Sequence, residues 1–157
     1  MNSERETYIT IVPDSFVQMS SGQITGVIYF QFGEKAFPAP EWNDFVVVML
    51  CWWLEAVVQL VDGIKERAEL WFMDGPFYVR IFTKGREGWY LECIHSRKNN
   101  EVVEYSTLVE PMNMLKSLLS VADETINQCQ KNEWTLSDLD LLIARSNQMR
   151  SHLMKLP

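Results

Sequence analysis

The sequence has few of the residues from which catalytic, metal-binding and disulfide sites are built. Its 157 residues include three cysteines, two histidines, seven glycines and six prolines. The cysteines are odd in number, far apart and surrounded by apolar residues, which indicates reduced core thiols in a cytosolic protein rather than a disulfide framework. Neither histidine has a companion at metal-ligand or catalytic-triad spacing, and no CxxC pair or glycine-rich phosphate loop occurs. The residues alone therefore indicate no metal, no cofactor and no catalytic centre.

Positive charge and long apolar runs are also scarce. The chain has 14 Lys and Arg against 21 Asp and Glu, which gives a net charge of -7. Because an acidic surface repels a phosphate backbone, nucleic acids are not expected as partners. The longest apolar run, 45–54, is about half of the roughly 20 residues that a membrane-spanning helix needs, and the polar first residues do not resemble a secretory signal. These features predict a cytoplasmic protein without a membrane partner.

Apolar and aromatic residues, in contrast, are plentiful, at 47% and 12% of the chain. This content is enough to bury a core that offsets the entropy of ordering the chain. Since a chain of this length has room for one domain, we expect residues 1–157 to fold as a single unit.

Alternating apolar residues predict six antiparallel strands. Tyr8–Val12 and Ile24–Phe32 form a predicted hairpin, whose connection, 14–23, contains a turn-prone Ser-Ser-Gly cluster. Short polar turns separate four further strands, which form a predicted meander. These strands are Glu69–Met73, Phe77–Thr83, Trp89–His95 and Val102–Thr107. Within 77–83 one face is plainly apolar, whereas the face with Tyr78, Arg80 and Phe82 is mixed.

A central helix is predicted from Asn43 to Val61. The residues there are nearly all apolar, yet Glu55, Gln59 and Asp62 are spaced three and four apart and would form one polar stripe on a helix. A buried strand at 45–50 is the alternative, because three consecutive valines are β-branched. The apolar segment is, however, too long for one strand.

The C-terminal third also has helical spacing. Pro111 suits a first helical turn, and apolar residues recur at alternating intervals of three and four up to Cys129. A last helix is predicted after Thr135, which precedes Asp138 by three residues in a pattern similar to a capping box. The expected architecture is therefore α+β: an antiparallel sheet of about six strands, made of the hairpin and the meander, packs on a long central helix, and two C-terminal helices follow.

The negative charge is concentrated towards the N-terminus. Up to Asp62 the chain has eight acidic and two basic residues, whereas the remainder has 13 acidic and 12 basic residues. This asymmetry indicates either a solvated acidic surface or a docking face for a basic protein. The candidate docking charges are Asp14, Glu34, Glu41, Asp44, Glu55 and Asp62.

Two aromatic patches add Trp42 and Asp74 to these candidates. The first patch, 37–45, has the sequence FPAPEWNDF, and the second, 71–77, has the sequence WFMDGPF. Each patch also has a structural explanation. In that explanation Trp42 fills the core, Asp44 caps the central helix and Asp-Gly-Pro forms a tight turn.

The two patches and the apolar segment between them carry a resemblance to a known family. In order, they contain F-P, W-x-D-F, W-W-L and F-M-D-G-P-F within residues 37–82. This order resembles a family of small proteins of Gram-positive bacteria, some of which look like immunity proteins of polymorphic or contact-dependent toxins. The resemblance implies a cytoplasmic protein that binds and blocks one toxin domain without doing chemistry. The acidic part of the chain would then face a basic toxin surface.

Two other classes of function remain open. A small-molecule-binding module or enzyme would use the aromatic residues to line a pocket between sheet and helix, although the sequence shows no acid–base pair for it. A self-assembling subunit, for example a dimer, would use the two last helices as its interface.

Overall fold

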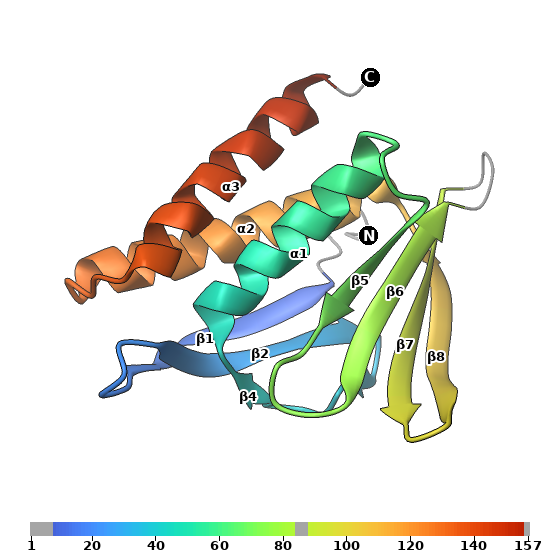
Figure 1. Cartoon of the computed structure of the whole chain (residues 1–157), viewed down its shortest axis with the longest axis horizontal. Helices are drawn as coiled ribbons and strands as arrows, with labels where there is room; N and C mark the ends of the chain where they lie inside the picture. Colours follow the sequence, from blue (N-terminus) through green and yellow to red (C-terminus); the bar gives the residue numbers. More distant parts are fainter. Residues whose placement is uncertain (1–7, 84–87, 156–157) are drawn as a thin grey trace.

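The computed structural model describes residues 8–83 and 88–155 and shows an α+β fold (Figure 1). Within these residues the elements in chain order are β1 (Ile9–Gln18), β2 (Ile24–Phe32), β3 (Lys35–Phe37), β4 (Asn43–Asp44), α1 (Val46–Val61), β5 (Arg67–Trp71), β6 (Phe77–Thr83), β7 (Trp89–Arg97), β8 (Asn100–Val109), α2 (Pro111–Lys131) and α3 (Ser137–Lys155). None of the helices in this part of the chain is long and apolar enough to cross a membrane.

The strands form two antiparallel sheets of four strands each, which corrects the expectation of a single six-stranded sheet. Sheet A has the order β1-β2-β3, with β4 also pairing with β2, and sheet B has the order β5-β6-β7-β8. The reason is that β3 pairs with β2 at Phe30–Phe32 while β4 pairs with it at Gly26 and Val27. These two short strands occupy the edge of β2 that the meander would need in order to join the hairpin.

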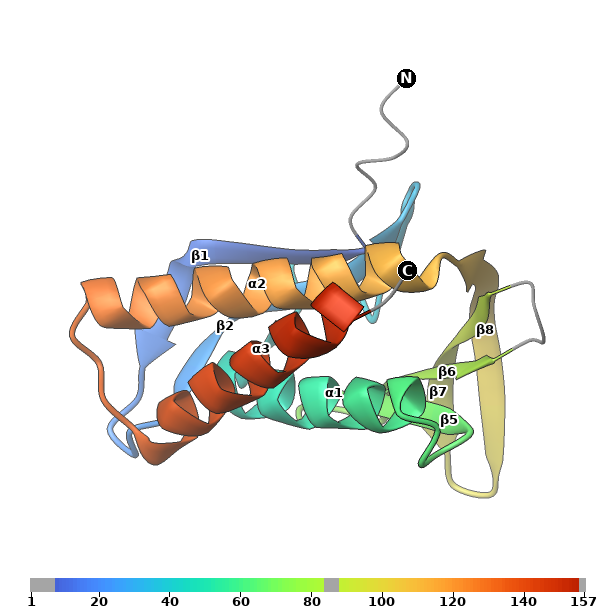
Figure 2. The same cartoon turned by 90° about the horizontal axis from the view of Figure 1, so that it is seen from above.

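The helices pack in two layers on sheet A. α2 contacts β1, α1 contacts β2, and α3 lies across both helices (Figures 1 and 2). Sheet B stands beside this stack, and its first strand, β5, contacts α1. α1 is therefore enclosed by sheet A, sheet B and two helices, which explains why an almost wholly apolar helix is stable here.

α1 begins later than predicted. Asn43 and Asp44 pair with β2 as β4, so the helix starts at Val46 rather than at Asn43. Its C-terminal end is marked by Gly63, which has a φ of 78 and donates its amide to the Leu60 carbonyl. Glycine adopts this left-handed conformation without a steric penalty, as is usual just after a helix.

β1 is longer than predicted. It continues past Pro13 to Gln18, and its register with β2 shifts between Val12 and Val17. A proline removes a backbone donor, which is tolerated at a bulge on an edge strand. The Ser15 hydroxyl lies within this bulge, donates to the Val12 carbonyl at 2.6 Å and accepts from the Val27 amide at 2.8 Å.

The core lies where α1 meets both sheets. Trp53 is completely buried, and its ring centroid lies 5.2 Å from those of Phe30 of sheet A and Phe72, which follows β5. Cys51, Cys93 and Cys129 are buried and unpaired. Burial raises the pKa of the Cys51 and Cys93 thiols to about 12.

Candidate functional site

Asp44 is the one candidate docking residue whose side chain lies inside the protein. It is 2% exposed, and its carboxylate accepts hydrogen bonds from Trp42 Nε1 at 2.9 Å, from the Asp74 amide at 3.0 Å and from the Phe45 amide at 2.8 Å. The carboxylate therefore joins the β3–β4 connection, the start of α1 and the β5–β6 turn. This arrangement gives Asp44 a structural role and removes it from the surface.

Trp42 and Asp74 belong to the same cluster. The Trp42 ring is partly buried and makes edge contacts with Phe72 and Phe77, at centroid distances of 6.2 and 5.5 Å. Asp74 is exposed, as is Glu41 next to Trp42. The structure thus brings Glu41, Trp42 and Asp74 together at one end of the molecule.

Glu55 and Asp62 lie on the helical side and face α3. Glu55 forms an ion pair with Arg145 at 3.4 Å. Asp62 Oδ1 lies 2.7 Å from His152 Nε2, while His152 Nδ1 lies 2.9 Å from the Gln148 carbonyl. Both acids help to hold α3 against α1, so a partner could use them only by competing with these contacts.

Asp14 and Glu34 are exposed at two further places. Asp14 lies in the bulged part of β1, and Glu34 lies in the turn between β2 and β3. Neither carboxylate has an ion pair with another residue in the described ranges. The predicted docking residues therefore do not form one continuous site, and four of the acids, Asp14, Glu34, Glu41 and Asp74, have free side chains on the surface.

The outer face of sheet B is a surface that none of the three helices covers (Figures 1 and 2). Its inner face contacts the core, and the three helices lie on that side (Figures 1 and 2). On the outer face, the pairing register arranges the side chains in three rows across the four strands. The rows are Trp71–Tyr78–Ile94–Val103, Glu69–Arg80–Glu92–Ser106 and Arg67–Phe82–Tyr90–Leu108.

Hydrogen bonds hold the charged middle row in place. Arg80 Nη2 and Nε lie 2.8 and 2.9 Å from Glu92 Oε1, and Arg80 Nη1 lies 3.3 Å from Glu101 Oε1. The Tyr78 hydroxyl donates to Glu101 Oε2 at 2.5 Å. Burial and this hydrogen bond raise the pKa of Tyr78 to about 12, while the bonds from Tyr78 and Arg80 lower the pKa of Glu101. The four side chains form one interlocked network.

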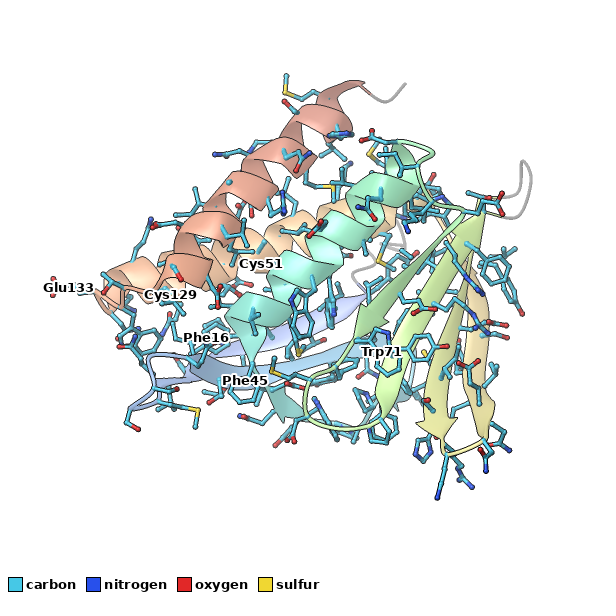
Figure 3. The ribbon with its side chains drawn as sticks, in the orientation of Figure 1. Phe16, Phe45, Cys51, Trp71, Cys129 and Glu133 are labelled. Carbon is cyan, nitrogen blue, oxygen red and sulfur yellow. The ribbon has the colours of Figure 1, made fainter. Side chains whose placement is uncertain are left out.

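Apolar side chains flank this network on both sides. Trp71 stacks on Tyr78 with a centroid distance of 4.2 Å (Figure 3 shows Trp71 on β5). Trp71, Val103 and Leu108 are 36%, 45% and 51% exposed, which is high for such large apolar residues. Tyr78 and Ile94 are almost fully buried under their neighbours, although they lie outside the main core.

The aromatic residues between sheet and helix, which could have lined a pocket, instead fill the core. Phe30, Trp53 and Phe72, which lie there, are buried and pack against one another. One hollow, of about 680 Å³, is an open groove on the outer face of sheet B. It is lined by Glu66, Arg67, Arg80, Phe82, Thr83 and Glu92.

Sequence reasoning missed the outer face of sheet B as a site. The alternation of Tyr78, Arg80 and Phe82 marked a mixed face, but the acids that complete it, Glu92 and Glu101, lie on other strands. Side chains alternate between the two faces along β7 and β8. This alternation, combined with an assumed pairing register for the hairpins, was the signal that could have placed Glu92 and Glu101 on this face.

The described part of the chain contains no group of three or more His, Cys, Asp or Glu side chains that could hold a metal ion. Comparisons with protein-family models, with curated proteins and with solved structures give no significant match.

Proposed function

We propose that the protein is a non-catalytic binding protein of the immunity type, which neutralises a toxin domain by covering it with the outer face of sheet B. The observation that carries the proposal is the open sheet face itself. It presents Arg80 and also Trp71, which stacks on the buried Tyr78, and Trp and Arg are among the residues that most often dominate binding energy in protein interfaces.

The network on this face supports a preformed binding surface. Arg80 is held by Glu92 and Glu101, so its side chain loses little further freedom when a partner binds. The free acids at the surface and the net charge of -7 favour a basic partner, because opposite charge accelerates the encounter.

The experiment begins with a tagged chain expressed in its native cell. Proteins that co-purify are identified by mass spectrometry, produced separately and tested for binding and for loss of toxicity on co-expression. Val103→Asp and Leu108→Asp each place a charge among apolar side chains of the outer face, at exposed positions. We expect each to weaken binding on the order of tenfold or more, because the bound partner would bury the new carboxylate without a counter-charge.

Leu141→Asp on α3 is the matched control. Leu141 is 41% exposed but lies in the helical layer, so the same substitution there should leave affinity unchanged. A toxin partner that binds all three variants like the parent would exclude the outer face. A chain that neutralises a toxin by modifying it covalently would exclude the non-catalytic mechanism.

A further inference from the structure

The backbone of β5 has one free edge. The Phe72 amide donates to the Phe77 carbonyl, and the Ser96 amide donates to the Pro76 carbonyl, at 3.0 and 2.8 Å. Bonded and non-bonded pairs alternate along an antiparallel ladder. With the observed register, both bonds lead to the same assignment: residues 68 and 70 bond to β6, whereas residues 67, 69 and 71 direct their amides and carbonyls away from β6.

Trp71 shows that this assignment is correct. Its carbonyl accepts a hydrogen bond at 2.8 Å from Trp53 Nε1, which lies on α1 rather than on β6. The other outward groups are the amides and carbonyls of Arg67 and Glu69 and the amide of Trp71. None of them has a hydrogen-bond partner in residues 8–83 or 88–155.

A groove of about 300 Å³ runs beside this edge. We call it the β5 groove; it is lined by Ala56, Gln59, Lys65, Arg67, Ala68 and Glu69. Ala56 and Gln59 share one stripe of α1 with Trp52, which is 43% exposed, because residues four and three apart lie on one helix face. The groove thus has a strand edge on one side and a partly apolar helix stripe on the other.

The end of the groove nearest Lys65 is positively charged. Lys65 and Arg67 are exposed, and neither forms an ion pair with a described residue. Glu69, an exposed acid, follows Arg67 in the lining, and beyond it the bond between Trp53 and the Trp71 carbonyl places α1 beside the end of β5. Free amides and carbonyls in a row are complementary to another extended backbone, and the positive charge at one end adds a preference for an acidic side chain.

We propose that the β5 groove binds an extended peptide segment of the partner protein, which joins sheet B as a further strand beside β5. Its side chains on the α1 side are apolar, and an acidic side chain lies opposite Arg67. This inference rests on the proposed protein-binding function and names the part of the partner that is bound and how it is held.

The test uses a phage-displayed library of random peptides, selected on the full chain. The enriched peptides are synthesised, and their affinities are measured by calorimetry for the parent, Glu69→Ala and Glu69→Pro. Glu69→Ala keeps the outward amide, so its affinity should stay within about twofold of the parent. Glu69→Pro removes that amide but no bond to β6, and we expect affinity to fall on the order of tenfold or more.

Amide exchange measured by NMR on the parent chain provides a test that needs no variant. The amides of Arg67, Glu69 and Trp71 should exchange quickly in the free chain and become protected when the selected peptide binds. Ala68 and Leu70 should be protected in both states. Peptides that bind without protecting the three outward amides, or that bind Glu69→Pro as tightly as Glu69→Ala, would overturn the inference.

Three further outcomes are informative. If the edge instead pairs with a second copy of the chain, sedimentation will show a dimer that Glu69→Pro dissociates, and the peptide proposal is wrong. If a toxin partner is lost with Val103→Asp but the library yields no peptide dependent on Glu69, this inference fails while the proposed function stands. If no protein partner depends on either surface, the proposed function fails as well.

Discussion

Asp44 shows how a single buried carboxylate can organise a surface without being part of it. Its two oxygens accept three N–H donors from three different segments of the chain. A buried charge is tolerated only when it is well hydrogen-bonded, and removal of the acceptor leaves the donors unsatisfied. The carboxylates of Glu41 and Asp74, in contrast, are exposed and have no comparable role in the fold.

We predict that Asp44→Ala lowers the free energy of unfolding by about 3 kcal/mol, because hydrogen bonds to a charged group contribute about 1.5–3 kcal/mol each and part of the loss is recovered by water. Chemical denaturation measures this directly. Glu41→Ala is the control and should change stability by less than about 0.5 kcal/mol. Equal stability of the two variants would contradict the role assigned to Asp44.

The buried thiols and Tyr78 make the protein sensitive to alkali. Burial raises the pKa of Cys51, Cys93 and Tyr78 to about 12, above the ordinary values of 9.0 for cysteine and 10.0 for tyrosine. In each case the folded state holds the proton more tightly than the unfolded state. The resulting stabilisation is complete below pH 9 and is lost as the pH rises towards 12.

We therefore expect the melting temperature to fall steadily above pH 9, and Ellman's reagent to react with the native chain at pH 8 far more slowly than with the denatured chain. Cys93→Ala should reduce the alkaline loss, because Cys93 is completely buried. Rapid labelling of all three native thiols would show that the core is open.

At the scale of elements, the periodicity of apolar residues was a good guide where a segment is long. It predicted 77–83 with its observed bounds, and it predicted a helix, rather than a strand, for 43–61, of which 46–61 is helical. It missed β3 and β4, since three- and two-residue strands are too short to show a period, and with them it missed the separation into two sheets. The same limit applies to the site. Acidic residues can be identified directly in the sequence. The rows on sheet B, however, depend on the pairing register between its strands, which a single sequence does not reveal.

The bulge in β1 is a second feature that no periodic pattern predicts. Ser15 Oγ bridges the two strands there by donating to the Val12 carbonyl and accepting from the Val27 amide. We predict that Ser15→Ala destabilises the protein by about 1–2 kcal/mol, because the Val27 amide loses its acceptor. Ser20→Ala, in the exposed turn after β1, should be neutral in the same denaturation experiment. A Ser15→Ala variant as stable as Ser20→Ala would mean that water replaces the hydroxyl fully.

At the scale of the whole molecule, the helices bury one side of both sheets and leave the other side of sheet B open (Figure 2). Two of the predicted docking acids, Glu55 and Asp62, hold α3 in place, and Asp44 is internal. The charge of the N-terminal part is therefore divided between internal contacts and free surface acids. Only the free acids can attract a partner without a cost in stability.

This division leads to a prediction about association. If a basic partner is steered by the free acids, its association rate should fall steeply as salt rises from low to physiological concentration, while the dissociation rate changes less. Glu34→Lys combined with Glu41→Lys should slow association further and leave the melting temperature nearly unchanged, because both side chains are exposed.

Glu55→Lys provides the contrast for that experiment. It makes the same change in net charge as either single reversal, but it replaces the ion pair with Arg145 by a repulsion between α1 and α3. It should therefore lower the melting temperature, whereas its effect on the association rate should not exceed that of one surface reversal. Stopped-flow mixing at several salt concentrations measures the rates for all variants. An association rate that responds to neither salt nor the double reversal would show that the acids keep the protein soluble and do not guide its partner.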